Sequence, residues 1–464
     1  MIELDKSGNL CNIVWIMENL EREMRIKVDF TRGQGKIRAL NGSNFGPNLS
    51  GQKNFNANED FKALRIPYAR LHDVPLDNPG MRLVDVQLIF GNWEADENDP
   101  RNYYFKQTDD YIRNIRSLGT DIIYRLGPSI EHSLENYLAY PPPDMDKWVR
   151  ICLNIVRHYN EGWANGFSWN IKYWEVWNEP NAKPHMWSGS NELYMKLYGK
   201  FALALKAHNP ELKVGGPSLS CPVQPERWEK PWQFTKDFLS YCRKNRIPID
   251  FFTWHCYPVD LDYIIKEPYK YRKLLDEYGF KDTELQLNEW HFTENWANTP
   301  EWKMGMHGIN GIDSACAAAN ILSWWQDSPL TMGNYYTVGS RGGWGVIDIY
   351  RRKFKTYYAL YAFAQMLDYD VRVKAVSSKQ EISILAGKNE KNSEGAILVS
   401  DFNSAVKELE LELNGCSPDQ VKIRVLDEAH DLEEIPAEIR KGNLILKKQY
   451  PASLWLITGL VCKS

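Results

Sequence analysis

Short apolar runs alternate with amphipathic segments from about residue 36 to residue 366, and this alternation constrains the fold more than any other feature of the sequence. Segments with apolar residues at helical spacing lie between the runs. One of them follows Ser190, a candidate N-cap, and ends at Asn209 and Pro210. The runs expected to be strands are 37–45, 61–72, 120–127, 171–179, 212–218, 249–258, 283–292 and 330–339. Strands that alternate with helices predict a parallel sheet covered by helices.

Eight strand and helix units are the number that a (β/α)8 barrel requires, and in that fold the catalytic groups lie at the carboxyl ends of the strands. Several of the runs end in such groups, namely Arg70 and His72, Asn178 and Glu179, His255 and Tyr257, and Glu289. A doubly wound open sheet is the alternative fold. It usually carries a GxGxxG turn after its first strand, whereas the sequence there reads GSNFGP. We therefore predict a (β/α)8 TIM barrel over residues 36–366.

The pattern changes after about residue 367 to an alternation of apolar and polar residues with a period of two. Residues 408–413 alternate glutamate with leucine, and residues 421–425 alternate valine or isoleucine with lysine or arginine. This alternation predicts antiparallel strands with one buried face, so residues 367–464 are expected to form an accessory β-sandwich-like domain. Residues 1–35 fit neither pattern, and they either add a strand to this domain or form a helix on the barrel.

The charge and cysteine content narrow the choice of partners and compartment. The 56 basic and 60 acidic residues nearly balance, which argues against a nucleic-acid partner. The sequence contains no stretch of about 18 apolar residues that would predict a membrane-spanning helix. The eight cysteines form no CxxC pair, which indicates free thiols and a reducing, cytoplasmic compartment, although a secreted protein with its signal peptide removed would look the same.

Two glutamates are the candidate catalytic groups. Glu179 ends an apolar run just before Pro180, which stops the strand, and Glu289 ends another run about three strand and helix units later. A single Asn-Glu-Pro tripeptide is as often structural as catalytic, but the second glutamate favours catalysis. Two carboxyl groups about 5–5.5 Å apart cleave a glycosidic bond with retention, because one protonates the leaving oxygen and the other attacks the anomeric carbon.

Several segments then resemble glycoside hydrolase family 39 of clan A, which is known for β-xylosidases and α-L-iduronidases. They are YARLH, YWEVWNEPN, LYGKFALALKAHNPELKVGGP, FLSYCRKNRIPIDFFTWHCYP, LNEWHF and the run 335–360. The resemblance covers about residues 61–366 and implies a retaining mechanism with Glu179 as acid/base and Glu289 as nucleophile, without a metal or cofactor.

The same resemblance implies roles for further residues. Asn178 would bind the 2-hydroxyl of the sugar, Tyr257 would hold the nucleophile, His72 and His255 would contact sugar hydroxyls, Arg70 would lie near the nucleophile, and Trp187 and Tyr336 would form walls of the pocket. The sequence departs from the β-xylosidases after the eighth strand, where YYTVGSRGGWG has glycines and Arg341 instead of an acidic pair.

The expected function is that of an exo-acting glycosidase for a β-linked pentoside or a related sugar, with a small glycoside or oligosaccharide as partner. Arg341, if it lines the pocket, would recognise a substituent that plain xylose lacks, so xylosides would be poor substrates. A uronic acid as glycone is the nearest alternative. A non-catalytic carbohydrate-binding barrel is a more distant one, because such a barrel would be expected to have lost one of the two acids. The oligomeric state stays open.

Overall fold

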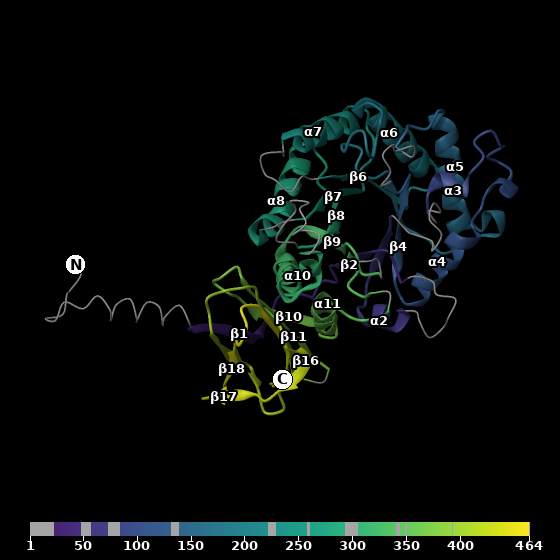
Figure 1. Cartoon of the computed structure of the whole chain (residues 1–464). Coiled ribbons are helices and arrows are strands. Elements are labelled where there is room, and N and C mark those ends of the chain that lie inside the picture. Colours follow the sequence, from purple (N-terminus) through teal and green to yellow (C-terminus); the bar gives the residue numbers. More distant parts are fainter. Residues whose placement is uncertain are drawn as a thin grey trace, which may run out of the picture. The chain divides into compact units, whose positions relative to one another are not determined.

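The chain divides into two compact units, shown in the computed structural model in Figure 1. One unit comprises residues 39–306 and 327–352, and the other comprises residues 1–38, 307–326 and 353–464. The structure describes residues 23–47, 57–72, 84–130, 139–220, 229–257, 260–292, 305–339, 344–348, 350–391 and 393–463.

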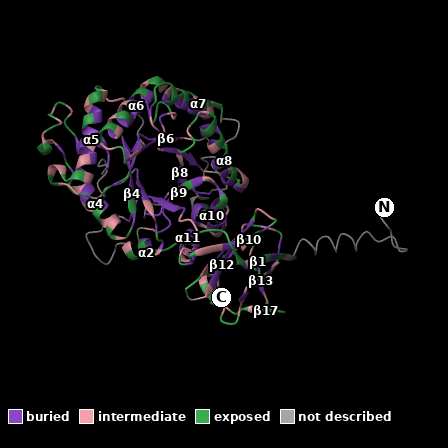
Figure 2. Cartoon of the chain, turned by 180° about the vertical axis from the view of Figure 1, so that it is seen from behind, coloured by how far each residue is buried: buried purple, intermediate pink, exposed green. Residues whose placement is uncertain are grey.

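The first unit is built on a closed barrel of parallel strands, whose buried ribbons are visible in Figure 2. The strands are β2 (Asn41–Asn44), β3 (Tyr68–Leu71), β4 (Asp121–Leu126), β5 (Tyr173–Val176), β6 (Lys213–Leu219), β7 (Phe251–Cys256), β8 (Glu284–Trp290) and β9 (Leu330–Tyr335). The barrel closes because β9 pairs in parallel with β2. The prediction of a (β/α)8 barrel is confirmed, and the open sheet is excluded.

Helices connect these strands and begin at the residues that the sequence favours. They are α2 (Asn58–Ala63), α3 (Val86–Ile89), α4 (Lys106–Ser117), α5 (Met145–Glu161), α6 (Asn191–His208), α7 (Glu229–Lys244) and α8 (Leu261–Glu277). Ser190 caps α6 as predicted, since its hydroxyl accepts a hydrogen bond from the amide of Leu193 at 3.1 Å. Asp144 and Asp260 cap α5 and α8 in the same way.

The lower part of the barrel interior is filled by apolar side chains, which leaves the polar ones for the mouth. Ile123, Tyr173 and Phe251 form a buried cluster against Tyr68. Strand side chains alternate in direction, so Glu175, two residues after Tyr173, points to the same interior side one layer nearer the mouth.

The second unit is built on a mixed sheet in which nearly every pair of strands is antiparallel. Its order is β16-β15-β19-β12-β11-β10-β1-β13-β18-β17, with β14 paired to β19. The strands are β1 (Glu23–Gly33), β10 (Val371–Ala375), β11 (Ile382–Asn389), β12 (Glu394–Asp401), β13 (Glu408–Asn414), β14 (Cys416–Ser417), β15 (Lys422–Leu426), β16 (Asp431–Ile435), β17 (Glu438–Arg440), β18 (Asn443–Lys447) and β19 (Ser453–Cys462). Helices α10 (Ile312–Trp324) and α11 (Lys355–Met366) belong to the same unit.

The sequence left open whether residues 1–35 add a strand to the β unit or form a helix on the barrel, and only residues 23–35 of this segment are among the described residues. Residues 23–33 form a strand that is antiparallel to β10 and parallel to β13. Its apolar side chains Ile26, Val28 and Phe30 join the core of the second unit. That core also takes Leu409 and Leu411 from β13, while the glutamates between them face outward, as their alternation predicts.

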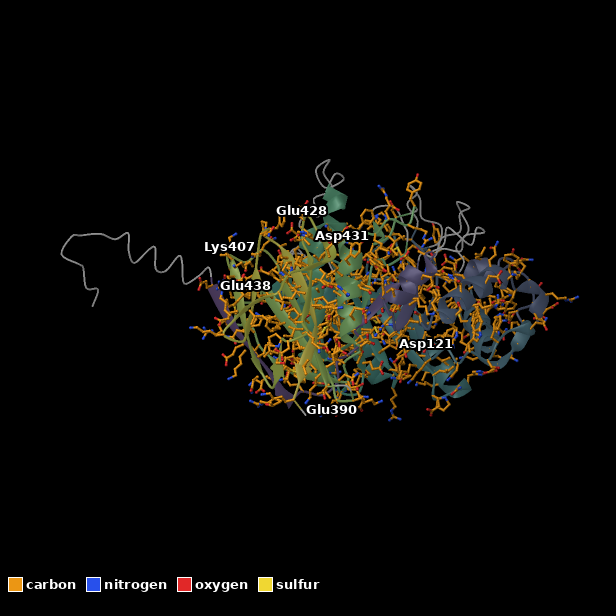
Figure 3. The ribbon with its side chains drawn as sticks, turned by 90° about the horizontal axis from the view of Figure 1, so that it is seen from below. Asp121, Glu390, Lys407, Glu428, Asp431 and Glu438 are labelled. Carbon is orange, nitrogen blue, oxygen red and sulfur yellow. A yellow bond between two sulfur atoms is a disulfide. The ribbon has the colours of Figure 1, made fainter. Side chains whose placement is uncertain are left out.

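Charged side chains cover the outside of the second unit. Figure 3 labels Glu390, Lys407, Glu428, Asp431 and Glu438 on its surface. Acidic and basic groups pair across neighbouring strands, as in the contact of Arg25 with Glu410 at 2.7 Å. Surface pairs of this kind contribute little to stability.

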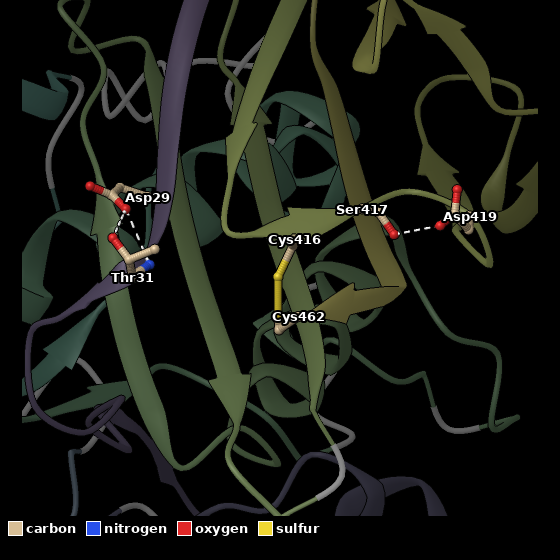
Figure 4. The surroundings of a disulfide bond; sticks show 6 residues. All are labelled: Asp29, Thr31, Cys416, Ser417, Asp419 and Cys462. Carbon is tan, nitrogen blue, oxygen red and sulfur yellow. Dashed lines mark hydrogen bonds between the residues drawn. A yellow bond between two sulfur atoms is a disulfide. The ribbon is translucent and has the colours of Figure 1, made fainter. Parts of the chain in front are cut away.

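The prediction of free cysteines is wrong for one pair. Cys416 on β14 and Cys462 on β19 form a disulfide, shown in Figure 4, with Cα atoms 4.0 Å apart. Antiparallel pairing places them directly opposite each other although 46 residues separate them in sequence. Four further cysteines are buried and form no disulfide, namely Cys152, Cys242, Cys256 and Cys316. The argument for a reducing compartment therefore loses its basis.

The helices within the described part of the chain give no reason to expect insertion into a bilayer. None of them is both long enough and apolar enough to cross a membrane.

Candidate active site

The carboxyl ends of four barrel strands bring polar side chains together. Arg70 lies on β3, His255 on β7 and Glu289 on β8, and Glu179 follows β5 by three residues. In barrel order, β5 is the fourth strand and β8 the seventh, so the two glutamates approach the mouth from different sides.

Arg70 is the centre of this cluster, and its side chain is fully buried. Its Nε donates to Glu175 at 2.6 Å, and one terminal nitrogen donates to Glu289 at 2.8 Å. The remaining hydrogen bonds go to Asn44 at 3.1 Å, Asn178 at 2.7 Å and Ser218 at 2.8 Å. Burial opposes the charge of the guanidinium, but the carboxylates of Glu175 and Glu289 outweigh it and raise the pKa of Arg70. The cation is therefore fixed between two carboxylates.

Glu289 is nearly buried, with 7% of its side chain exposed. Its carboxylate accepts a 2.5 Å hydrogen bond from the hydroxyl of Tyr257 in addition to the bond from Arg70. The ring nitrogens of His255 and His72 lie 3.4 Å and 3.6 Å from the same carboxylate. Burial raises the pKa of Glu289, and His255, Arg70 and the Tyr257 hydroxyl oppose that rise. These partners favour the ionised form.

Tyr257 stays a hydrogen-bond donor throughout the neutral range. Burial and the nearby carboxylate of Glu289 raise the pKa of Tyr257 well above its usual value. The expectation that Tyr257 touches the carboxylate of Glu289 agrees with this contact.

Glu179 has a different environment. Its side chain is 19% exposed, against 7% for Glu289. One carboxylate oxygen lies 2.7 Å from Nδ1 of His255, and its backbone amide donates to the carbonyl of Ser218 at 2.9 Å. The backbone is left-handed at Trp177 (φ 71°) and at Glu179 (φ 46°), an arrangement that costs energy and is concentrated at functional sites. The turn before Pro180 thus directs Glu179 into the mouth.

His255 lies between the two glutamates. Its Nδ1 contacts Glu179, and its Nε2 lies 2.8 Å from the hydroxyl of Ser218 and 3.4 Å from Glu289. A neutral imidazole donates from only one of its nitrogens, so the ring couples the protonation states of the groups on its two sides. Because protein groups contact both nitrogens, His255 is better placed to orient the carboxylates than to read sugar hydroxyls.

Asn178 is oriented by two donors to its side-chain oxygen. Arg70 and the hydroxyl of Ser218 donate to this oxygen at 2.7 Å and 2.9 Å. The amide nitrogen of Asn178 therefore points the other way, and it donates to none of the residues that the structure describes. This nitrogen is suitably oriented for a ligand hydroxyl.

Glu175, Ser218 and Asn288 complete the cluster and were missed by the sequence reasoning. Asn288 donates to Glu175 at 2.6 Å and to Ser218 at 2.9 Å. The sequence offered a way to find Glu175 and Asn288, because each is a polar residue inside an apolar run that contains a candidate catalytic glutamate near its end. Nothing in the sequence distinguishes Ser218 from other serines.

The structure bears differently on the predictions for Tyr336, Trp187 and Arg341. Tyr336 is half-buried and packs edge-on against Tyr257, with ring centroids 6.3 Å apart. Trp187 is fully buried, its indole N–H donates to the carbonyl of Ser190 at 2.8 Å, and its ring packs against Trp177. The expectation that Trp187 forms a wall of the pocket is corrected, because its segment turns the ring into the core. Arg341 lies outside the described residues.

Metal ligation is not suggested by the side chains that the structure describes. No group of three or more histidine, cysteine, aspartate or glutamate side chains in this part of the chain has an arrangement that holds a metal ion.

Fold and cluster together define a (β/α)8 barrel with two glutamates and a buried arginine at its mouth. Residues 132–300, which contain both glutamates, match the model of the glycosyl hydrolases family 39. The chain is 26% identical over 293 residues to a β-xylosidase of Caldicellulosiruptor saccharolyticus, covering 59% of this chain and 56% of that protein. The resemblance to family 39 is thereby confirmed, and the alignment spans little more than half the length of this relative.

Other comparisons extend this result to the fold. A β-xylosidase of Geobacillus stearothermophilus is 34% identical over 152 residues, which cover 32% of this chain and 26% of that protein. The crystal structure of a glucosidase from Croceicoccus marinus superposes with a TM-score of 0.76 at 21% identity, over 95% of this chain and 99% of that one. A monomeric β-xylosidase from Caulobacter crescentus CB15 gives 0.69 at 15% identity, over 94% and 99%. These structures share both the barrel and the β unit.

Proposed function

We propose that the protein is a retaining, exo-acting glycosidase of the β-xylosidase type, which hydrolyses a β-linked pentoside or a related sugar. The observation that carries the proposal is the asymmetry of the two glutamates around His255. Glu289 is enclosed and receives hydrogen bonds from Arg70 and Tyr257, whereas Glu179 is more exposed and contacts the imidazole from the other side. One carboxyl group is thus supported as an anion, and the other has access to the solvent.

In the first half of the reaction, Glu289 attacks the anomeric carbon while Glu179 donates its proton to the leaving oxygen. The electron pair of the broken bond goes to that oxygen, and a glycosyl ester forms on Glu289. Arg70 loses one of its two anionic partners at this step, and Glu175 still balances its charge. Asn178 offers its amide nitrogen to the 2-hydroxyl, an interaction that strengthens as the sugar ring flattens.

In the second half, Glu179 acts as a base. It takes a proton from a water molecule whose oxygen attacks the anomeric carbon, and Glu289 leaves as a carboxylate. Arg70 and Tyr257 stabilise this leaving carboxylate because they hold the positions from which they donated to it before. The anomeric configuration is retained after two inversions.

The test separates the two roles by their response to the leaving group. Glu289→Ala is expected to abolish turnover of every aryl glycoside, a loss on the order of 10⁵-fold, because no covalent intermediate forms. Glu179→Ala is expected to spare substrates with acidic leaving groups, which need little protonation, and azide is expected to restore part of its activity. Glu211→Ala, at an exposed glutamate of the same unit, serves as the control and retains full activity.

Two outcomes contradict the proposal. If the two variants respond alike to the leaving group, the roles are misassigned. If NMR of the first-formed product shows an inverted anomer, the double displacement is wrong.

A panel of aryl β-xyloside, β-glucoside and α-L-iduronide identifies the glycone. A folded protein that hydrolyses none of these or any related aryl glycoside contradicts the enzymatic function. The expectation for Arg341 is tested on the same panel, because a high kcat/KM on the xyloside that is unchanged in Arg341→Ala rules out a substituent-reading role.

A further inference from the structure

A buried carboxylate lies behind the strand that carries His255. Glu267 belongs to α8 and is 1% exposed. Figure 1 labels α8 in the outer ring of helices, next to β7. The proposed mechanism does not use this carboxylate, and a buried ionisable group of this kind needs a reason to be there.

The side chain of Glu267 accepts hydrogen bonds from both neighbours of His255. The indole N–H of Trp254 donates to its Oε2 at 2.8 Å, and the thiol of Cys256 donates to the same carboxylate. Tyr263, one turn earlier in α8, donates its hydroxyl to Oε1 at 2.7 Å. Side chains alternate in direction along a strand, so Trp254 and Cys256 point toward α8 while His255 points into the barrel. Glu267 therefore holds β7 on both sides of His255.

These contacts lie where the pairing of β7 becomes irregular. Trp254 pairs with Leu287 of β8. The next residue, His255, pairs with Glu289, so one residue of β8 has no counterpart on β7. A bulge of this kind disrupts the ladder of backbone hydrogen bonds and changes the direction of side chains. Regular pairing alone therefore does not fix the direction of His255, and contacts on the outer face of β7 contribute to it.

Burying a carboxylate at this place costs free energy. Burial raises the pKa of Glu267 to about 7, while the hydrogen bonds from its three donors and the charge of Lys270 oppose this rise. An apolar side chain would fill the same space without the cost of desolvation. A carboxylate, however, accepts hydrogen bonds from several donors at once. A glutamine in the same place has only one acceptor oxygen, because its amide nitrogen is a donor.

His255 connects this carboxylate to the catalytic groups. Its Nδ1 lies 2.7 Å from Glu179, and its Nε2 lies 3.4 Å from Glu289. A small displacement of β7 lengthens the first contact and thereby impairs the proton transfer that Glu179 performs.

We propose that Glu267 is a positioning residue, which holds the two neighbours of His255 and thereby fixes the imidazole against Glu179. The proposal rests on the proposed function. Glu267 lies on the outer face of β7, so it acts through the strand and not on the substrate.

The test compares kcat/KM for phenyl β-xyloside, whose leaving group needs protonation, with kcat/KM for dinitrophenyl β-xyloside, whose leaving group needs little. Glu267→Gln keeps the size of the side chain and removes one acceptor oxygen. The ratio of the first constant to the second is expected to fall about tenfold, because the acid role of Glu179 is impaired. A merely structural role would lower both constants equally. Glu277→Gln, the same substitution at an exposed position of α8, is the matched control and leaves the ratio unchanged.

Two further variants show whether the effect passes through His255. In the background of His255→Asn, Glu267→Gln is expected to cause no further fall in the ratio, because the group that it positions is already missing. Tyr263→Phe removes one donor at a half-buried position. It is expected to lower the ratio by about threefold, and it replaces Glu267→Gln in the test if that variant does not fold.

A measurement without substrate separates this inference from the proposed function. The NMR signals of the His255 imidazole nitrogens are assigned with His255→Asn in protein that carries isotope-labelled histidine. They are expected to shift in Glu267→Gln and to stay in place in Glu277→Gln. Equal losses on both substrates with unmoved His255 signals overturn the inference and leave the proposed function intact. Shifted signals in a protein that hydrolyses no aryl glycoside support the positioning of His255 by Glu267 and contradict the proposed function.

Discussion

The two units of the chain differ in how many charged side chains they bury together. The barrel buries Arg70 with Glu175 and nearly buries Glu289, whereas the core cluster of the β unit consists of apolar side chains and most of its ion pairs lie at the surface. Where the β unit does bury a charge, as at Lys448, the carboxylate of Asp401 lies 2.8 Å away and pairs with it. Moving an ion pair out of water costs more than its attraction usually returns, so the barrel carries its pair for a reason other than stability.

Hydrogen bonds from the guanidinium of Arg70 offset part of the cost of burying its charge. Every nitrogen of the Arg70 guanidinium donates to an oxygen, and the two carboxylates on either side balance its charge. These hydrogen bonds fix the position of the guanidinium, and a catalytic site needs its charges fixed before the substrate arrives. The contrast predicts that similar substitutions have very different effects in the two units.

The largest effect is expected for Arg70→Ala. It leaves Glu175 and Glu289 buried without their cation, which is expected to cost about 3–5 kcal/mol of stability, and it removes the stabilisation of the anionic Glu289. Unfolding in urea and kcat/KM on an aryl glycoside measure the two losses. Arg70→Lys is expected to restore little, because one ammonium cannot reach the positions of all three guanidinium nitrogens. Full activity in Arg70→Lys would show that the network is not needed as a whole.

Loss of the disulfide is expected to destabilise the β unit without affecting the chemistry. Cys416 and Cys462 close a loop of 46 residues, for which the chain-entropy model gives about 4 kcal/mol. Replacing both cysteines by serine, or reducing the bond, is expected to lower the unfolding midpoint and leave kcat at 25 °C unchanged. Reductant has no further effect on the double variant. An unfolding midpoint that does not respond to reductant would mean that the two cysteines are thiols in solution.

A smaller and more specific effect is expected for Tyr257→Phe. The Tyr257 hydroxyl opposes the rise that burial gives to the pKa of Glu289, so removing it raises this pKa further. The nucleophile must be ionised, and activity is lost as the pH falls through its pKa. The acid limb of the kcat/KM profile is therefore expected to move to higher pH, with a loss of about 10- to 100-fold near its optimum.

Tyr269→Phe is the matched control for this measurement. Tyr269 is half-exposed, and its hydroxyl donates to the carbonyl of Asp327, away from the cluster. Its profile is expected to match that of the unaltered protein. A loss of activity in Tyr257→Phe with an unmoved acid limb would mean that Tyr257 acts on the sugar rather than on Glu289.

Local patterns in the sequence account for the parts of the fold that could be predicted. Most barrel strands, which are four to seven residues long, are apolar, although β2 reads NGSN. Polar residues at the ends of the apolar runs indicated Arg70, Glu179, His255 and Glu289. The alternation of residues 408–413 identified a half-buried strand in the same way. These signals are visible because burial imposes a period on neighbouring residues.

Contacts between residues far apart in the chain could not be predicted, because they produce no periodic pattern in the local sequence. Cys416 and Cys462 meet because β14 and β19 pair, and β1 reaches its place beside β13 from the other end of the chain. The indole of Trp187 faces the core because its segment turns back toward Ser190, a direction that the sequence does not encode locally. Ser218 joins the cluster only because Arg70 and His255 come to it from other strands.

The smallest effect on stability and activity is expected for Arg440→Ala. This variant is the surface counterpart of Arg70→Ala. Arg440 also bridges two carboxylates, since it contacts Glu408 and Glu438, but all of these groups lie at the surface of the β unit. Water solvates both the charges that are paired and the charges that would be left behind, and salt screens their attraction. Urea unfolding and kcat/KM are therefore expected to be unchanged within error at 0.15 M salt, while the same substitution at Arg70 affects both. If Arg440→Ala destabilised the protein as much as Arg70→Ala, burial would not be the cause of the difference between the two units.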